Sequence, residues 1–479
     1  MQAGSAKPTI ILATSNGIGM GHLARATAIG QALQSQANPI IISMASAVAE
    51  IPEATGIPAE YITGRDRGLM PRYKWDKYLR DRILALVEET GATILTFDGV
   101  VPYPGVLAAK IAKPDLTLVW IRRGLWQKKP QRFVLGMQSK IMDYVVEPGD
   151  YARAYDHGPT SKRKESKLFS PVSLFKVDRA LNKKTAKEKL GLDPNRPAVL
   201  VQLGTGDADV NQKMHAALSG LIGWKDLQVV LTKEPKDKNG NSLAPIGLDI
   251  KVVRYFPLAD LLFAFEAGIC AAGYNGVHEL LAAGLPTVFV SNIRGTDDQE
   301  TRARWCSDHN AALMADQGNL IDIESAVKKL QSESVRKKLT EGCAKLPATT
   351  GAAEIAEFLL TLSKPVTATK ILQNVRYRGF SIYGVLRKKP IDAIKYLAVF
   401  FLEKAGLSYR TLFPHKATTP PITGLPIYSE TNKADELRAF VKAPRRFEHL
   451  IPNCSENYLK RRREIANNAY ELSSNGSIK

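Results

Sequence analysis

The sequence predicts an α/β protein with two doubly wound, Rossmann-like domains that face a cleft, followed by a basic carboxyl-terminal extension. The length of 479 residues is too great for one compact core, so more than one domain is expected. Short apolar runs alternate with segments of helical periodicity before residue 170 and again after residue 176, which is typical of βαβ units around a parallel sheet. This alternation stops after residue 363. We therefore predict domains at 1–170 and 176–363 and an extension at 364–479.

Each half supplies its own strands and helices. In the first half the strand-like runs are PTIILAT, PIIISMA, ATILTFD and LTLVWI, with LARATAIGQALQSQ and YLRDRILALVEETG as helical segments. The next stretch, YARAYDHGPTSKRKESKLFSP, is polar and basic, and we interpret it as a linker or loop. In the second half the strand-like runs are AVLVQLG, LQVVLT, IKVVRYF, AGICAAG and PTVFVS, with VNQKMHAALSGLIG and VHELLAAG as helices. One basic helix, IDIESAVKKLQSESVRKKLTEG, closes this half, and AAEIAEFLLTLS is a candidate to return and pack on the first domain.

Composition excludes several classes of protein. The chain is 44% hydrophobic and 24% charged, which is ordinary for a globular protein, and its four cysteines lack the spacing of a zinc site or a disulfide framework. The beginning of the chain does not have the pattern of a signal peptide, and no apolar run approaches the length that spans a bilayer. We expect a cytoplasmic protein without a transmembrane segment.

The net charge of +19 is unevenly distributed. About +12 of it falls in residues 364–479, and further cations alternate with aromatic residues in RDRGLMPRYKWDKYLRDR and IRRGLWQKKPQR. Such clusters suit an anionic membrane, a phosphorylated acceptor or nucleic acid. For the extension, two interpretations stay open: an element that lies on an anionic bilayer, and an ordered appendage that packs on the core.

A glycine-rich loop, NGIGMGH, follows the first strand and opens the first helix. Gly19 and Gly21 permit a tight turn, and a helix start attracts negative charge. The glycines do not have the Gly-x-Gly-x-x-Gly spacing, and the second strand ends in SMAS without an acid, which argues against a nicotinamide-cofactor site.

His22 and Asp98 form a candidate catalytic pair in the first domain. His22 begins the first helix, where a histidine serves either as a general base or as a structural cap. Asp98 ends the strand TILTFD at the same sheet edge, where it would either orient the imidazole or cap a loop.

A second constellation lies in the other half. Gly273 and Gly276 stand at a helix start that can seat a phosphate, and Gly204-Thr205-Gly206 after the strand AVLVQL forms a second such seat. Glu279, one turn into the helix, is suited to accept hydrogen bonds from two ribose hydroxyls. Asp298 and Gln299, beyond the last strand of the unit, are suited to bind sugar hydroxyls.

The segment GYNGVHELLAAGLPTVFVSNIRGTDDQETRA resembles the donor motif of GT-B glycosyltransferases. It is most similar to that of the lipid-linked N-acetylglucosaminyltransferases of peptidoglycan synthesis and their galactolipid-synthase relatives. The opening SNGIGMGHLARATAIGQAL resembles the glycine-rich loop of the same group. The resemblance implies an inverting transfer from a nucleotide sugar, most simply a UDP-sugar, to an acceptor hydroxyl.

The resemblance also implies roles for individual residues. Glu279 would hold the ribose, Asp298 and Gln299 the donor sugar, and His22 would be the base with Asp98 as its partner. Backbone at Phe256 would read the nucleobase. Amides around Gly204, Thr205, Tyr274, Asn275 and Gly276 would hold the diphosphate. Related enzymes of peptidoglycan synthesis carry two glutamines where this chain has Asp298-Gln299, so the sugar stays open.

No cofactor or metal is expected, since the nucleotide sugar is a substrate and helix-start amides can stabilise the leaving diphosphate. Asp207 and Asp209 have the spacing of a metal motif, but they follow the phosphate-seat glycines and are interpreted as a helix cap. The acceptor is expected against the first domain, on a cationic and aromatic surface formed by Arg122, Arg123 and Trp126 together with Arg72, Tyr73 and Trp75.

The expected partners are the nucleotide-sugar donor and a lipid-linked or glycan acceptor, with an anionic membrane at the inner face as a further candidate; nucleic acid is not expected. Two alternative functions remain. One is a nucleotide-sugar epimerase or hydrolase of the same fold, and the other is a non-enzymatic binder of membrane or nucleic acid.

Overall fold

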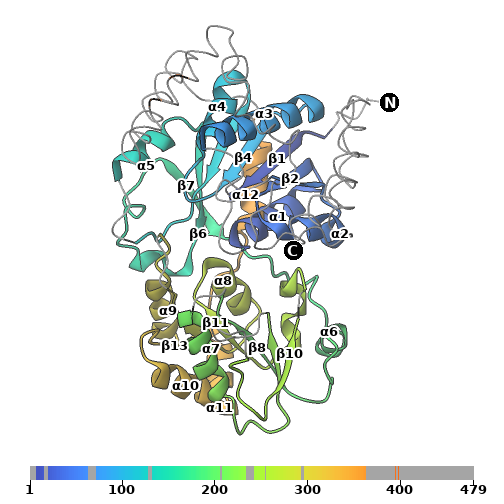
Figure 1. Cartoon of the computed structure of the whole chain (residues 1–479), viewed down its shortest axis with the longest axis vertical. Coiled ribbons are helices and arrows are strands. Elements are labelled where there is room, and N and C mark those ends of the chain that lie inside the picture. Colours follow the sequence, from blue (N-terminus) through green and yellow to red (C-terminus); the bar gives the residue numbers. More distant parts are fainter. Residues whose placement is uncertain are drawn as a thin grey trace, which may run out of the picture.

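The structure is a computed structural model that describes residues 7–15, 20–62, 72–127, 132–204, 208–232, 242–253, 255–292 and 296–362, with two further isolated positions, 394 and 398. The described residues form two α/β domains that lie one above the other (Figure 1). The predicted extension at 364–479 lies outside the described residues apart from those two positions.

The first domain contains a seven-stranded sheet in which each described strand pair is parallel. Its strand order is β3-β2-β1-β4-β5-β6-β7, which begins with the doubly wound pattern 3-2-1-4-5-6. The strands are β1 (Thr9–Thr14), β2 (Asn38–Ser43), β3 (Ala59–Tyr61), β4 (Ile94–Asp98), β5 (Thr117–Ile121), β6 (Tyr144–Gly149) and β7 (Ser166–Pro171). Their helices are α1 (Gly21–Leu33), α2 (Ile51–Thr55), α3 (Arg72–Thr90), α4 (Pro104–Ala112) and α5 (Arg132–Ser139), with the short 3-10 helices η1 (Ser46–Glu50) and η3 (Tyr151–Tyr155).

The second domain repeats the same winding around a six-stranded parallel sheet of order β10-β9-β8-β11-β12-β13. Its strands are β8 (Ala198–Gln202), β9 (Gln228–Leu231), β10 (Asp249–Val252), β11 (Ala267–Ala271), β12 (Thr287–Val290) and β13 (Leu313–Ala315). Its helices are α6 (Lys183–Lys189), α7 (Ala208–Ser219), η4 (Leu258–Ala264), α8 (Tyr274–Ala282), α9 (Gln299–Asp308), α10 (Leu320–Lys329) and α11 (Glu333–Cys343). The predicted class, two doubly wound domains in tandem, is confirmed.

The central strands were predictable because both of their faces are buried. Every residue of β4 is buried, and so is every residue of β5, and both strands are accordingly rich in apolar residues, ILTFD and TLVWI. These strands separate two layers of core, one of which lies under α3 and α4 and the other under α1.

Two predictions about secondary structure were wrong. The stretch interpreted as a linker contains β7, which forms the edge of the first sheet; its residues are only partly buried or exposed, so it lacks an apolar run. The predicted single basic helix is divided into α10 and α11 at residues 330–332. Ser332 stands at the start of α11 in an extended conformation, which interrupts the helical hydrogen bonds.

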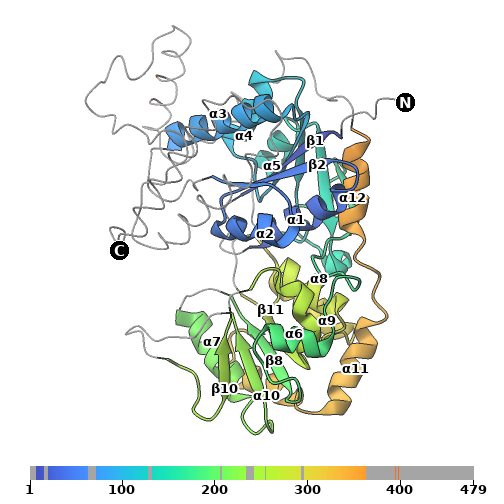
Figure 2. The ribbon, with the colours of Figure 1, turned by 90° about the vertical axis from the view of Figure 1, so that its right-hand side faces the viewer.

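The last helix described, α12 (Gly351–Leu360), returns to the first domain, as the sequence suggested. It packs on α1 and β7, and Figure 2 shows it beside the upper sheet although it follows α11 of the lower domain. The side chain of Glu354 on α12 accepts a hydrogen bond from the backbone amide of Ser170 at 2.9 Å. The chain therefore crosses between the domains twice.

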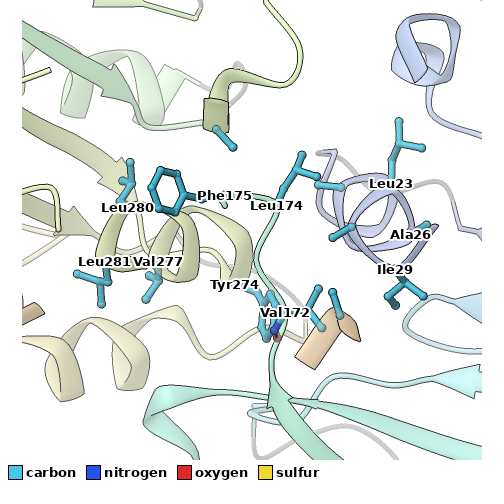
Figure 3. Close-up of a cluster of buried hydrophobic side chains, with 14 of the residues drawn as sticks. Leu23, Ala26, Ile29, Val172, Leu174, Phe175, Tyr274, Val277, Leu280 and Leu281 are labelled. Carbon is cyan, nitrogen blue, oxygen red and sulfur yellow. Dashed lines mark hydrogen bonds between the residues drawn. The ribbon is translucent and has the colours of Figure 1, made fainter. Parts of the chain in front are cut away.

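One hydrophobic cluster joins the two domains. Figure 3 shows Leu174, in the segment that follows β7, between α1 and α8, with Val172 beside Tyr274 and Phe175 beside Leu280 of α8. The phenol of Tyr274 donates to the carbonyl of Gly149 at 2.8 Å and accepts from the amide of Val172 at 2.9 Å. These contacts seat the start of α8 against the first domain. Among the described residues, none of the helices is both long and apolar enough to cross a membrane.

Candidate functional site

The first half of the candidate site lies where the winding of the first sheet reverses. The strand order runs outward in one direction from β1 and in the other direction from its neighbour β4, and Thr14 pairs with Asp98 at the carboxyl ends of these two strands. Ligands of doubly wound sheets bind beyond the strand ends at this position. The helix α1 begins there, so His22 lies in its first turn above Asp98.

His22 and Asp98 are in direct contact. The Nδ1 atom of His22 lies 2.6 Å from an oxygen of Asp98, and the two side chains are 15% and 1% exposed. A carboxylate only accepts hydrogen bonds, so this contact favours the tautomer with the proton on Nδ1, in which Nε2 has a free lone pair. The structure thus brings together the two residues that the sequence proposed as a pair.

A third residue, Arg25, completes the cluster. Its Nε donates to Oδ2 of Asp98 at 2.9 Å and its Nη2 donates to Oδ1 at 2.6 Å, a two-pronged ion pair that is almost wholly buried. The same Nη2 lies 2.9 Å from Nδ1 of His22. Sequence analysis did not select Arg25, because it stands among small apolar residues in a helical segment and its partner is 73 positions away.

Burial and charge set the ionisation of this cluster. Burial alone would raise the pKa of Asp98, but the charges and hydrogen bonds of Arg25 and His22 outweigh burial and hold that pKa below its usual value. Burial lowers the pKa of His22; Asp98 opposes this in part, and the charges of Arg25 and Arg123 add to the lowering. The lowered pKa favours the neutral imidazole, which is the state that a general base requires.

The second half of the site lies at the corresponding reversal of the second sheet, between β8 and β11. Gly204 follows β8 with a φ of +102°, which side-chain-bearing residues rarely adopt. Gly276 lies in the first turn of α8, and a Cβ there would lie 2.8 Å from the Sγ of Cys270. No side chain caps α8, so its first amides are available to an anion.

Glu279 lies on α8, and its side chain is half-buried. None of the described residues makes a hydrogen bond or an ion pair with its carboxyl group. Burial raises the pKa of that group to about 8, and the nearby charge of Asp260 adds to the effect. A partly buried acid that lacks a partner among the described residues is typical of a group that a ligand completes.

Asp298 and Gln299 begin α9, close to the start of α8. The carboxylate of Asp298 caps α9 by accepting from the amide of Thr301 at 3.1 Å. Gln299 is buried, and its Oε1 accepts from the amide of Asn292 at 2.9 Å. Its Nε2 lies 3.8 Å from the position of a Cβ on Gly273, which places the amide beside the first turn of α8. Their binding of a sugar stays a prediction.

The two halves meet directly. Asn275, in the first turn of α8, donates to the carbonyl of Gly21 at 3.1 Å and lies 3.4 Å from Nη1 of Arg25. The guanidinium of Arg25 also lies 5.0 Å from the ring centre of Tyr274. Figure 1 shows α1 at the lower side of the first domain and α8 at the facing side of the second. The two neighbours of the candidate base on α1, Gly21 and Arg25, therefore contact the candidate phosphate seat of the other domain.

The prediction of a cationic and aromatic surface on the first domain is wrong for the side chains that the structure describes. Arg122 is fully buried and pairs with Glu165 at 2.8 Å, and Trp126 is 4% exposed. Arg123 pairs with Asp297 of the second domain at 2.6 Å, and Trp75 is buried in the core. Clustering along the sequence could not show which of these side chains point inward. The side chains of Arg72 and Tyr73 lie outside the described set.

Asp297 is at the centre of an interdomain ion-pair network that sequence analysis missed. Besides Arg123 it pairs with Arg302 at 3.0 Å, and Arg302 reaches Asp150 of the first domain at 2.9 Å. Burial would raise the pKa of Asp297, but the two arginines outweigh it and hold it well below its usual value. Backbone contacts join the same segments, since the amide of Asp298 donates to the carbonyl of Leu125 at 3.1 Å.

The remaining predicted residues are placed as follows. Phe256 is partly buried against the core just before η4. Gly19, Thr205 and Gly206 lie outside the described residues, and so does Asp207. Asp209 pairs with Lys213 at 2.7 Å within α7. Within the described part of the chain, no group of three or more His, Cys, Asp or Glu side chains is arranged to hold a metal ion.

Comparisons with known proteins point to glycosyltransferases. Residues 198–358 match the glycosyltransferase family 28 C-terminal domain. A relative from a Nocardioides species is 34% identical over 30% of this chain and 40% of its own length. A relative from Frankia casuarinae is 24% identical over 73% of this chain and 94% of its own length. Both are UDP-N-acetylglucosamine–N-acetylmuramyl-(pentapeptide) pyrophosphoryl-undecaprenol N-acetylglucosamine transferases. The chain spans 40% of the length of the first two curated relatives that it matches.

Solved structures show the same fold. The glycosyltransferase of kitacinnamycin superimposes with a TM-score of 0.51 at 13% identity, over 74% of this chain and 99% of that one. The spinosyn forosaminyltransferase superimposes with a TM-score of 0.50 at 14% identity, over 75% of this chain and 100% of that one. The GT-B fold that the sequence motifs implied is confirmed.

Proposed function

We propose that this chain, which has the GT-B fold and carries a match to the glycosyltransferase family 28 C-terminal domain, transfers a sugar from a nucleotide sugar to a hydroxyl of a lipid-linked acceptor. One observation carries the proposal. His22 contacts Asp98 at 2.6 Å, and the residue before it, Gly21, accepts a hydrogen bond from Asn275 at the uncapped start of α8, across the boundary between two doubly wound domains. A base and an anion seat from different domains suit a reaction between two separately bound substrates.

The second domain would bind the donor. Glu279 supplies a carboxyl group that has no hydrogen-bond partner among the described residues, which suits the two hydroxyls of a ribose. The first amides of α8 would hold the diphosphate, and Asp298 and Gln299 would lie near the sugar. We propose UDP-N-acetylglucosamine as the donor to test first, because the curated relatives are named for it.

The reaction that fits the geometry is an inverting displacement without a metal. Nε2 of His22 takes the proton of the acceptor hydroxyl as its oxygen forms a bond to the anomeric carbon. The bond from that carbon to the diphosphate oxygen breaks, and the leaving group carries the electron pair away. Amides at the start of α8 and the helix dipole stabilise the charge that develops there. Asp98 stabilises the imidazolium that forms on His22.

The proposed acceptor is lipid-linked because the curated relatives act on a pyrophosphoryl-undecaprenol substrate. Such a substrate stays in the bilayer, so we propose that the protein works at the cytoplasmic face of the membrane as a peripheral protein.

The test is an incubation with UDP-N-acetylglucosamine labelled in the sugar, with and without a pyrophosphoryl-undecaprenol acceptor. The proposal expects UDP release and labelled lipid only when the acceptor is present. UDP or free sugar released at the same rate without acceptor would indicate a hydrolase or an epimerase instead. Glu279→Ala should weaken binding of UDP, whereas Glu341→Ala, an exposed acid on α11, should not.

A further inference from the structure

Arg25 occupies the position between the candidate base and the candidate donor helix. It stands three residues after His22 on α1, a spacing that places both side chains on one face of the helix. Asp98 contacts both: its Oδ1 lies 2.6 Å from Nδ1 of His22 and 2.6 Å from Nη2 of Arg25. With Nε on the other oxygen, the planar guanidinium fixes the carboxylate in one orientation.

The same guanidinium group lies within hydrogen-bond distance of His22 as well as of Asp98. Its Nη2 lies 2.6 Å from Oδ1 of Asp98 and 2.9 Å from Nδ1 of His22, and it carries two N–H groups. In the tautomer with the proton on Nδ1, His22 donates to Asp98, Nη2 can donate only to Asp98, and Nε2 is a base. In the other tautomer, the second N–H of Nη2 donates to Nδ1, the proton of His22 stands on Nε2, and the base is lost. The contacts of Arg25 therefore bear on which tautomer His22 adopts.

The remaining contact of Arg25 is with the other domain. Its Nη1 lies 3.4 Å from Oδ1 of Asn275, and Nδ2 of Asn275 donates to the carbonyl of Gly21. Asn275 is in the first turn of α8, where the proposed diphosphate seat lies. The guanidinium also faces the ring of Tyr274, whose hydroxyl is fixed by Gly149 and Val172. Arg25 thus contacts the donor helix with one nitrogen and the carboxylate partner of the base with the other two.

We propose that Arg25 is a positioning residue that couples occupation of the nucleotide seat at α8 to the orientation of His22 through Asp98. The inference rests on the proposed function and adds to it: a bound diphosphate at the start of α8 changes the Asn275–Arg25 contact and holds Arg25 on Asp98. His22 is then a competent base chiefly when the donor is bound, which disfavours activation of an acceptor before the donor is in place.

The test observes His22 itself by NMR of protein labelled with ¹³C and ¹⁵N in histidine, with UDP as the probe. Its signals are assigned with His22→Asn. In the native protein, UDP should increase the share of the tautomer with the proton on Nδ1. In Arg25→Lys the charge remains but the two-pronged contact is lost, so UDP should bind without changing the His22 signals. In Arg304→Met, an exposed arginine on α9, the response to UDP should be that of the native protein.

A second variant separates positioning from charge. The charged groups that act on His22 are Asp98, Arg25 and Arg123. Arg25→Met leaves Asp98 with one cationic neighbour fewer, so the pKa of His22 should rise, which Arg25→Lys should not produce. Melting temperatures of all variants show whether each one folds. If Arg25→Lys fails to fold, Asn275→Ala, which leaves the Arg25–Asp98 pair in place, should abolish the same response to UDP.

The outcomes are distinguishable. If UDP binds the native protein but leaves the tautomer of His22 unchanged, the coupling is overturned and the proposed function stands. If Arg25→Lys keeps the full response, Arg25 does not transmit it and the inference is wrong. If UDP and UDP-N-acetylglucosamine both fail to bind, the proposed function fails and the coupling fails with it.

Discussion

The affinity for a nucleotide should rise with pH as Glu279 titrates. Burial, with the nearby charge of Asp260, raises the pKa of this carboxyl group from 4.5 to about 8. In the nucleotide-free protein roughly one carboxyl group in ten is therefore ionised at pH 7 and roughly nine in ten at pH 9. An ionised carboxylate accepts hydrogen bonds from both ribose hydroxyls, whereas a protonated one must donate its own proton.

The magnitude follows from this ionisation. If the bound state requires the carboxylate, the Kd for UDP falls roughly tenfold between pH 7 and pH 9, or about 1.4 kcal/mol. Binding at pH 7 should also release close to one proton per site. Isothermal titration calorimetry in buffers of different ionisation enthalpy measures both quantities.

Glu279→Gln is the matched control, since it keeps the size of the side chain and cannot ionise. Its affinity should be independent of pH apart from the titration of the ligand, which both proteins share, and it should release no proton at this site. A flat profile in the native protein, or the same slope in the Gln variant, would refute the role of Glu279 as a ribose ligand that titrates.

Three further perturbations have defined outcomes. Asp98→Asn should lower kcat by roughly 10²- to 10⁴-fold with little change in the Kd for UDP, because the amide no longer selects the reactive tautomer of the base; an unchanged kcat would exclude the catalytic pair. Asp297→Ala should destabilise the fold by about 3–5 kcal/mol in urea titrations, since it leaves two buried arginines without this partner; a loss below about 1 kcal/mol would show that the network is dispensable. Gly276→Ala should lower the Tm, because its Cβ would lie 2.8 Å from the sulfur of Cys270, while Gly21→Ala, with nothing within 4 Å, should not. Equal Tm changes in the two glycine variants would contradict that packing argument.

Most of the fold was predictable from the sequence, and the exceptions have a physical cause. Strands such as β4 and β8 are buried on both faces and are rich in apolar residues. The residues of the edge strand β7 are only partly buried or exposed, so they carry no such signal, and β3 and β13 are only three residues long. The pattern of apolar residues in the sequence therefore indicates which residues are buried, and it does not detect a strand that is not buried.

The proximity of His22 and Asp98 was predictable from their places in the sheet. Both lie at the carboxyl ends of the strands that flank the reversal of winding, and the structure places them in contact. Arg25 could not be found in this way, because an arginine in a helical segment is usually a solvated residue. The prediction for Arg122 was wrong in the opposite direction. Its charge suggested that it lies at the surface, but it is buried and pairs with Glu165. Only the contacts in the folded protein distinguish a buried, paired arginine from a solvated one.

The central claim is that His22 removes the acceptor proton while Glu279 and α8 hold the donor. The most direct test compares His22→Asn with the native protein in one experiment that measures both the Kd for UDP and the rate of transfer from UDP-N-acetylglucosamine to a pyrophosphoryl-undecaprenol acceptor. The account predicts an unchanged Kd with a fall in kcat of at least roughly 10²-fold. A variant that transfers the sugar at the native rate would contradict it.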